Sequence, residues 1–173
     1  MERKGLLKFA GNAVTVIGPD LQAGEKAPEF TALAMDWSQV KGLRSTQGKV
    51  RIIASLPSLN TAVCDRETRR FNQEAAALGP DVAILTVSMD LPFTLKNWCA
   101  SAGIDQVVTL SDAKAADFGK KYGVLVKEQR ILRRAVFVVN RQGMVTYAAY
   151  MPALGDEPDY AEVLSAARQA LQD

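Results

Sequence analysis

Short apolar runs alternate with amphipathic segments along the chain. Val50–Leu56 and Val82–Ser88 are nearly continuous apolar runs of strand length that include β-branched residues, a pattern typical of buried strands. Between them, apolar and small residues recur at the spacing of one helical face: Cys64, Thr68, Phe71, Ala75 and Leu78. Gly79-Pro80 stops this pattern. We therefore predict a strand, a helix that begins at about Thr61, and a second strand.

The alternation continues through the middle of the chain. Phe93–Ala102 predicts a helix that ends at Gly103, and Val107–Leu110 predicts a short strand. Ser111-Asp112 is well placed to cap a further helix that runs to about Tyr122.

The last third of the chain predicts a hairpin and a final helix. Ala135–Val139 and Val145–Tyr150 flank Asn140–Gly143, whose residues favour a turn. Asp159–Leu171 has the spacing of an amphipathic helix.

The order of these elements predicts an α/β fold. Alternating strands and helices, followed by a hairpin and a helix, indicate a central mixed sheet with helices on both faces. This order resembles that of the thioredoxin-like fold. Leu6–Phe9 and Val14–Ile17 flank Gly11-Asn12 and predict an added N-terminal β-hairpin. At 173 residues, we expect one domain, 1–173.

Charge and hydropathy exclude several classes of partner. The 21 basic and 19 acidic residues leave a net charge of +2, and no run of Lys and Arg would follow a phosphate backbone, so we expect no nucleic-acid partner. No stretch of about 18 apolar residues indicates a membrane span. Lys8 interrupts the first apolar stretch before it reaches the length of a signal-peptide core. These features predict a cytoplasmic protein without a membrane partner.

The residue inventory narrows the chemistry. The chain has no histidine and two cysteines, Cys64 and Cys99, so the usual ligand sets for structural zinc, iron–sulfur clusters or histidine-ligated haem are missing. We therefore expect no metal and no cofactor. In a reducing compartment, any bridge between these cysteines would be transient and catalytic.

Cys64 stands where a thiolate would be stabilised. Cysteine reacts as the thiolate, which a helix N-terminus or a neighbouring arginine favours. If Thr61 is the N-cap, Cys64 falls in the first turn of the helix. Because Asp65 and Glu67 oppose this field, a further cation is needed nearby.

The segment Pro57–Cys64 matches the PxxxTxxC pattern, and the chain therefore resembles the peroxiredoxins. The resemblance implies that Pro57 covers the thiolate, that the Thr61 hydroxyl hydrogen-bonds a hydroperoxide, and that Cys64 attacks its terminal oxygen.

The resemblance is closest to the thiol peroxidase subfamily, the atypical two-cysteine peroxiredoxins, and it extends over essentially the whole chain. Besides Pro57–Cys64 with the following Arg69–Asn72, it rests on three stretches: Thr109–Asp112, Phe118–Leu125, and Arg134–Val138 followed by Glu157–Tyr160. It implies that Arg134 binds thiolate and peroxide, and that Cys99 resolves the sulfenic acid on Cys64 as a disulfide. It further implies thioredoxin as the reductant and a homodimer as the assembly. Organic hydroperoxides and hydrogen peroxide are the expected substrates.

Three positions depart from the subfamily pattern. Asn60 stands where the subfamily usually has Asp, Ala62 where it usually has Pro, and Asp65 adds an acid directly after the nucleophile. None of them removes a catalytic group.

Other interpretations remain open at this point. Cys99 could be an inert core residue, Thr61 could serve only as an N-cap, Pro57 could be a plain strand terminator, and Arg134 could be a surface residue beside Arg133. A non-catalytic redox sensor or binding module is the alternative function. A protein disulfide oxidoreductase is a third, although the cysteines lack the CxxC spacing of such enzymes.

The two cysteines are predicted to lie on different helices, separated by a strand. A disulfide requires Cα atoms within roughly 4.4–6.8 Å. We therefore expect the reduced thiols to lie too far apart to bond, so that disulfide formation requires local opening around Cys64, of the Phe93–Ala102 helix, or of both.

Overall fold

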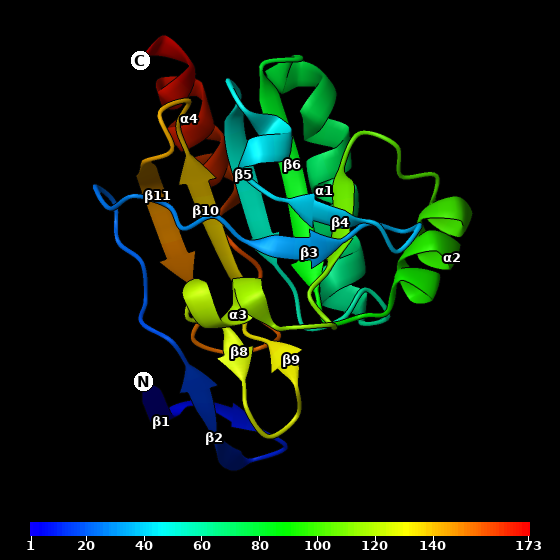
Figure 1. Cartoon of the computed structure of the whole chain (residues 1–173), viewed down its shortest axis with the longest axis vertical. Helices are drawn as coiled ribbons and strands as arrows, with labels where there is room; N and C mark the ends of the chain where they lie inside the picture. Colours follow the sequence, from blue (N-terminus) through cyan, green and yellow to red (C-terminus); the bar gives the residue numbers. More distant parts are fainter.

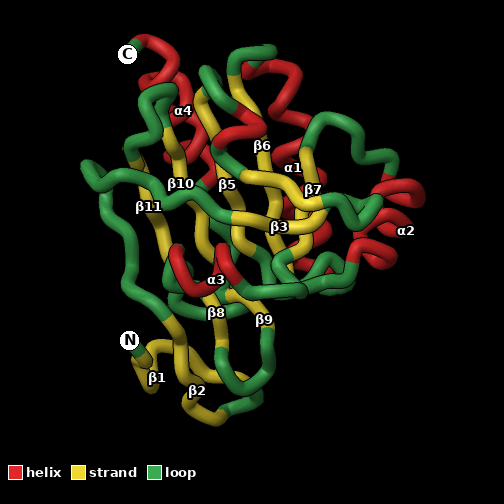
Figure 2. Tube along the Cα trace, viewed as in Figure 1, coloured by secondary structure: helices red, strands yellow, loops and turns green.

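The computed structural model describes all residues, 1–173, and its elements follow the predicted alternation (Figures 1 and 2). The helices are α1 (Ala62–Leu78), α2 (Pro92–Ala102), α3 (Asp117–Lys121), α4 (Tyr160–Gln172) and the short 3-10 helix η1 (Arg44–Thr46). The strands are β1 (Glu2–Phe9), β2 (Asn12–Ile17), β3 (Thr31–Leu33), β4 (Gln39–Lys41), β5 (Val50–Ser55), β6 (Val82–Ser88), β7 (Val108–Ser111), β8 (Leu125–Val126), β9 (Ile131–Leu132), β10 (Ala135–Val139) and β11 (Val145–Tyr150). None of the helices combines the length and the apolar character needed to cross a membrane.

The main sheet is mixed and has seven strands, in the order β11-β10-β5-β6-β7-β3-β4. β5, β6 and β7 run parallel, and β10 pairs antiparallel with β5. All six residues of β5 are buried, as expected for a parallel strand covered on both faces. The predicted α/β fold, with a central mixed sheet and flanking helices, is confirmed.

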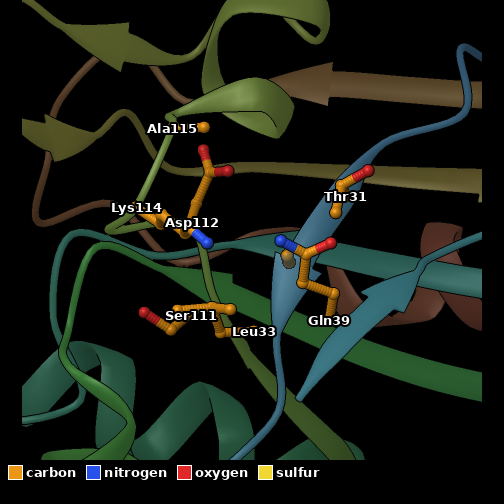
Figure 3. Close-up of a pocket in the computed structure, with 8 residues that line it drawn as sticks. Thr31, Leu33, Gln39, Ser111, Asp112, Lys114 and Ala115 are labelled. Atoms are coloured by element: carbon orange, nitrogen blue, oxygen red, sulfur yellow. The ribbon is translucent and has the colours of Figure 1, made fainter. Parts of the chain in front are cut away.

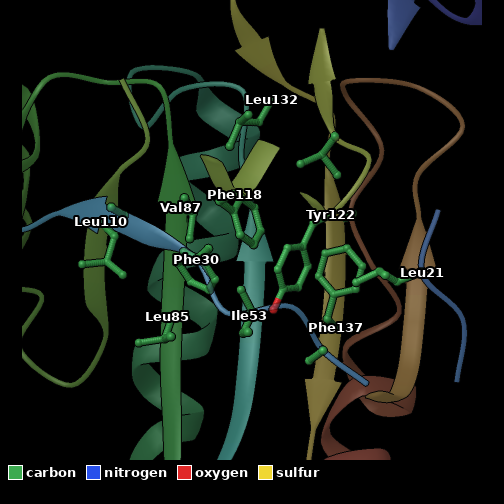
Figure 4. Close-up of a cluster of buried hydrophobic side chains, with 14 of the residues drawn as sticks. Leu21, Phe30, Ile53, Leu85, Val87, Leu110, Phe118, Tyr122, Leu132 and Phe137 are labelled. Carbon is green, nitrogen blue, oxygen red and sulfur yellow. The ribbon is translucent and has the colours of Figure 1, made fainter. Parts of the chain in front are cut away.

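Two hydrophobic clusters cover the two faces of this sheet. Side chains alternate along β5: Ile53 joins the cluster that α3 completes, whereas Ile52 and Ala54 join the cluster under α1 and α4. The first cluster is rich in aromatic rings, and Figure 4 shows Phe30, Phe118, Tyr122 and Phe137 gathered over the strands. Because both faces are covered, a site open to solvent can form only at the ends of the strands.

The N-terminal hairpin is present and belongs to a second sheet. β1 and β2 pair antiparallel, and β8 and β9 extend them into a four-stranded sheet in the order β1-β2-β8-β9. This small sheet lies beyond one end of the main sheet (Figure 1). The hairpin was predicted, but the two-residue strands β8 and β9 were not.

The helix expected directly after Ser111-Asp112 was predicted too long. The chain turns through residues 113–115, and α3 begins only at Asp117, after Ala116 with its left-handed φ of 51°. The Asp112 carboxylate still accepts hydrogen bonds from the backbone N–H groups of Phe118, at 3.1 Å, and Gly119, at 2.8 Å. Asp112 therefore accepts hydrogen bonds from the first N–H groups of α3 across a turn, but the N-cap residue is Ala116.

Candidate functional site

The turn between β5 and α1 is held in place by the Asp90 carboxylate. Asp90 accepts hydrogen bonds from the Ser58 hydroxyl at 2.7 Å and from the Leu59 N–H at 2.8 Å. Asp90 follows β6, so the neighbouring strand end fixes the turn. The role of Asp90 was not predicted, although an acidic residue directly after a buried strand is a signal that could have found it.

Thr61 is the N-cap of α1, as predicted. Its hydroxyl accepts a hydrogen bond from the Cys64 N–H at 3.4 Å and donates one to the Ser58 carbonyl at 2.9 Å. Cys64 therefore lies in the first helical turn, where the unpaired N–H groups favour negative charge.

The cation that the sequence required beside Cys64 is Arg134. Its Nη2 atom lies 3.1 Å from Cys64 Sγ, and both residues are buried. Nε and Nη2 also donate to the Leu154 carbonyl, each at 3.1 Å. The alternative of a surface arginine is wrong, because Arg134 is only 1% exposed.

Glu67 completes a buried group of charges that the sequence suggested only in part. One of its carboxylate oxygens accepts from Arg134 Nη1 at 2.5 Å, and the other is buried without a partner. Burial raises the pKa of Glu67 to about 7, although the charge of Arg134 acts in the opposite direction. Burial lowers the pKa of Arg134, but the charges of Glu67 and Cys64 together raise it above its ordinary value. Arg134 therefore stays protonated.

A pocket of about 390 Å³ opens beside this group. Arg134, Thr61 and Pro57 line it, and apolar residues complete the wall: Phe9, Val63, Ile131 and Leu154. Cys64 has no exposed surface and does not line the pocket, but its Sγ atom contacts Arg134, which does. Three of the five predicted site residues, Pro57, Thr61 and Arg134, thus line one pocket, and a fourth, Cys64, contacts Arg134 beside it.

Cys99, the fifth predicted site residue, lies apart on α2. It is a buried free thiol, and its Sγ atom lies 3.4 Å from the Thr109 hydroxyl. Cys64 is likewise a free thiol, on α1. The two helices approach each other through Leu95 and Trp98 of α2, which pack against the cluster that contains Cys64.

A second cavity, of about 100 Å³, shares no residue with the Cys64 pocket. Figure 3 shows it between β3, β4 and the segment after β7, with Thr31, Gln39 and Asp112 among its lining residues. Burial raises the pKa of Asp112 to about 6, yet both carboxylate oxygens accept N–H groups of α3. This carboxylate therefore has a structural role.

Comparison with known proteins first defines a class. A family model described as Redoxin matches residues 22–164. A solved peroxiredoxin-like protein from Aquifex aeolicus is 37% identical, with a TM-score of 0.85 and coverage of 97% of each chain. A thiol peroxidase from Chromobacterium violaceum is 22% identical and shares the fold, with a TM-score of 0.82 and coverage of 96% of this chain and 97% of that chain. The protein is a peroxiredoxin-type oxidoreductase.

Curated relatives narrow this class. A thiol peroxidase from Halalkalibacterium halodurans is 50% identical over 165 residues, which cover 95% of this chain and 98% of the relative. One from Bacillus subtilis is 45% identical over 162 residues, which cover 94% and 96%. The chain belongs to the thiol peroxidase family, as its sequence predicted.

The buried Glu67 generates a prediction about pH. Because its pKa rises from 4.5 to about 7 on folding, the protonated form is favoured in the native protein. Stability from this group is fully present below about pH 4.5 and is lost as the pH rises through 7. Relative to Glu67→Gln, wild type should lose about 3 kcal/mol of unfolding free energy over that range. Urea unfolding of both proteins at several pH values measures this difference. If the unfolding free energy of wild type rises relative to that of the variant as the pH increases, the prediction is contradicted.

Proposed function

We propose that the protein is a thiol-dependent peroxidase in which Cys64 reduces hydroperoxides. The Cys64 thiolate attacks the terminal oxygen, the O–O bond breaks, and the products are a sulfenic acid on Cys64 and an alcohol or water. The observation that carries the proposal is the Arg134 guanidinium, 3.1 Å from a fully buried sulfur at the first turn of a helix. Both features stabilise the charge on the attacking sulfur.

Arg134 has a second role in this proposal. Four of the five guanidinium N–H groups are used by Glu67, Cys64 and the Leu154 carbonyl. The remaining N–H, on Nη1, is free for the peroxide, because Arg134 also lines the pocket. A fixed donor at this place stabilises the negative charge that develops on the leaving oxygen.

Thr61 and Pro57 hold the substrate in this proposal. The Thr61 hydroxyl already donates to Ser58 and accepts from Cys64, so one lone pair remains to accept the O–H of a hydroperoxide. Pro57, a lining residue of the pocket, helps to keep water from the sulfur. Thr61 thus combines the N-cap with substrate binding.

Cys99 resolves the sulfenic acid, and thioredoxin reduces the resulting disulfide. Cys99 attacks the oxidised sulfur of Cys64, water leaves, and thiol–disulfide exchange restores both thiols. Because the cysteines lie on different helices, we infer that at least one of these helices opens locally before the bond forms.

The burial of Cys64 favours this function over the alternatives. Because Cys64 has no exposed surface, a protein disulfide could reach its sulfur only after a larger opening than a small hydroperoxide needs, and such a hydroperoxide can enter the adjoining pocket. This argues against a disulfide oxidoreductase. A non-catalytic sensor requires only a slow oxidation of Cys64. It would not need the buried Arg134 and Glu67 side chains beside the sulfur.

Two cysteine variants test the proposed cycle. Cys64→Ser should abolish turnover with thioredoxin, thioredoxin reductase and a hydroperoxide, because the chain has no histidine that could supply another route. Cys99→Ser should form the sulfenic acid with one equivalent of hydroperoxide but should not turn over with thioredoxin. Robust turnover by the first variant would contradict the assigned nucleophile, and normal cycling by the second would contradict the assigned resolving thiol.

The apolar pocket wall favours organic hydroperoxides. Phe9 reaches the pocket from the end of β1, opposite residues of α1 and of the segment after β11. An apolar substituent on the peroxide would be buried against these side chains. Hydrogen peroxide has no such substituent and gains nothing from this contact.

Phe9→Ala should therefore lower kcat/KM for cumene hydroperoxide by about fivefold to tenfold and leave that for hydrogen peroxide unchanged. Leu6→Ala is a matched control, because Leu6 is an equally exposed apolar residue of the same strand outside the pocket. Equal losses for both substrates in Phe9→Ala, or equal losses in both variants, would refute the assigned specificity.

A further inference from the structure

One face of α1 holds α2 and the segment that follows it. Asp65, Arg69 and Asn72 are spaced at i, i+4 and i+7, so they form a polar stripe along the helix, which we call the α1 stripe. The Asp65 carboxylate accepts from the Trp98 indole N–H at 3.1 Å. Asn72 accepts from the Gln106 backbone N–H at 2.8 Å.

Arg69 is the central residue of the stripe and makes three contacts. Its Nε donates to Asp65 at 2.8 Å, and its Nη1 donates to the Ala102 carbonyl at 3.3 Å. Its guanidinium also lies over the Trp98 ring, 5.8 Å from the ring centre. Trp98 directly precedes Cys99, and Ala102 is the last residue of α2. Arg69 therefore contacts the part of the helix that carries the thiol.

Few side chains of α2 are buried. Only three of its residues are buried, Pro92, Leu95 and Cys99, and its N-cap residue Leu91 makes no side-chain capping bond. Phe93 is 65% exposed, and its ring packs edge-to-face only against Trp37, with the ring centres 5.0 Å apart. Apart from the buried Cys99 and its contact with Thr109, the polar contacts that hold the C-terminal half of α2 are those with the α1 stripe.

We propose that the α1 stripe positions α2 and thereby sets the rate at which Cys99 reaches oxidised Cys64. This inference rests on the proposed function, in which Cys99 is the resolving thiol. The Cys99 sulfur attacks the sulfenic sulfur, the S–O bond breaks, and the hydroxyl leaves with the thiol proton as water. For that step the cysteine must leave its helical position, and the contacts of Trp98 and Ala102 with the stripe oppose this movement.

The stripe consequently controls a competition. While α2 stays folded, a second hydroperoxide can oxidise the sulfenic acid on Cys64 to the sulfinic acid and is itself reduced to the alcohol. A tighter stripe lengthens the life of the sulfenic acid and favours this loss, whereas a weaker stripe favours the disulfide. Asp65 is thus a positioning residue for α2, although it stands next to the nucleophile.

The test compares Arg69→Ala with Arg70→Ala. Arg70 is a matched control, since it also makes an i,i+4 ion pair, with Glu74, and also lies over an aromatic ring, at 5.2 Å, but that ring is Tyr160 of α4. The reduced proteins are mixed with one equivalent of hydroperoxide and quenched with a thiol-alkylating reagent, so that the disulfide is followed in time. Mass spectrometry then measures the sulfinic fraction after excess hydroperoxide.

Arg69→Ala should form the disulfide about fivefold to tenfold faster than wild type, the effect of losing a cation–π contact and a hydrogen bond across the helices. It should accumulate less sulfinic acid, and amides of residues 92–102 should exchange faster in its reduced form. Trp98→Phe keeps an aromatic ring but loses the N–H that donates to Asp65. It should likewise speed up disulfide formation and amide exchange in residues 92–102. Arg70→Ala should match wild type.

Two results would overturn the inference: disulfide formation by Arg69→Ala at or below the wild-type rate, or an equal acceleration in Arg70→Ala, which would indicate general destabilisation of α1. Cys99→Ser separates this failure from that of the proposed function. If Cys99→Ser still cycles with thioredoxin, the resolving thiol is wrong and the inference falls with it. If Cys99→Ser stops while Arg69→Ala resolves at the wild-type rate, the inference alone is wrong.

Discussion

A buried guanidinium must be matched by negative charge, and this requirement organises the Cys64 site. An unpaired charge inside a protein is costly, so Arg134 needs acceptors on several sides. Pairing of Ala135 with Ser55 brings Arg134 to the end of β5, beside the turn that leads to Cys64. Glu67 and Cys64 then approach it from α1, and the Leu154 carbonyl from the segment after β11.

One cation facing two acidic groups explains the electrostatics of the site. Arg134 cannot fully compensate two neighbouring anions in a buried place, so negative charge on the sulfur is best accommodated when the Glu67 carboxyl is neutral. Burial raises the pKa of Glu67 to about 7 against the opposing charge of Arg134, and this shift likewise favours the neutral carboxyl. The helix N-terminus, capped by Thr61, adds further positive field at Cys64. Helix α1 therefore supplies the nucleophile, a charge partner for Arg134 and, on another face, the contacts that hold α2.

The sequence predicted what is local and missed what depends on tertiary contacts. Pro57, Thr61 and Cys64 are contiguous with a strand end and a helix start, so their placement follows from the pattern of β5 and α1. Arg134 directly precedes the distant strand β10 and was assigned only through the family resemblance, because no spacing links it to Cys64. Glu67 was recognised as an opposing charge, but its ion pair needs the register of β10 on β5.

The fold shows the same division. β6 was predicted with its observed bounds, because a continuous apolar run is typical of a strand buried on both faces. β8 and β9 have two residues each and are too short to show an alternation of apolar and polar positions. The helix after β7 was predicted too long because Asp112 reaches α3 across a turn. Likewise, Asp65 was recognised as a departure from the family pattern, but its contact with Trp98 lies between helices.

The central claim is that the planar guanidinium of Arg134 activates Cys64, and the rate of sulfenic acid formation in Arg134→Lys tests it most directly. Lysine keeps the charge but cannot hold Glu67, Leu154 and the sulfur in one plane. In a single turnover with a hydroperoxide, we predict that the second-order rate constant falls by about 10²-fold or more, the scale expected when a preorganised donor is lost. A wild-type rate constant in the lysine variant would contradict the account.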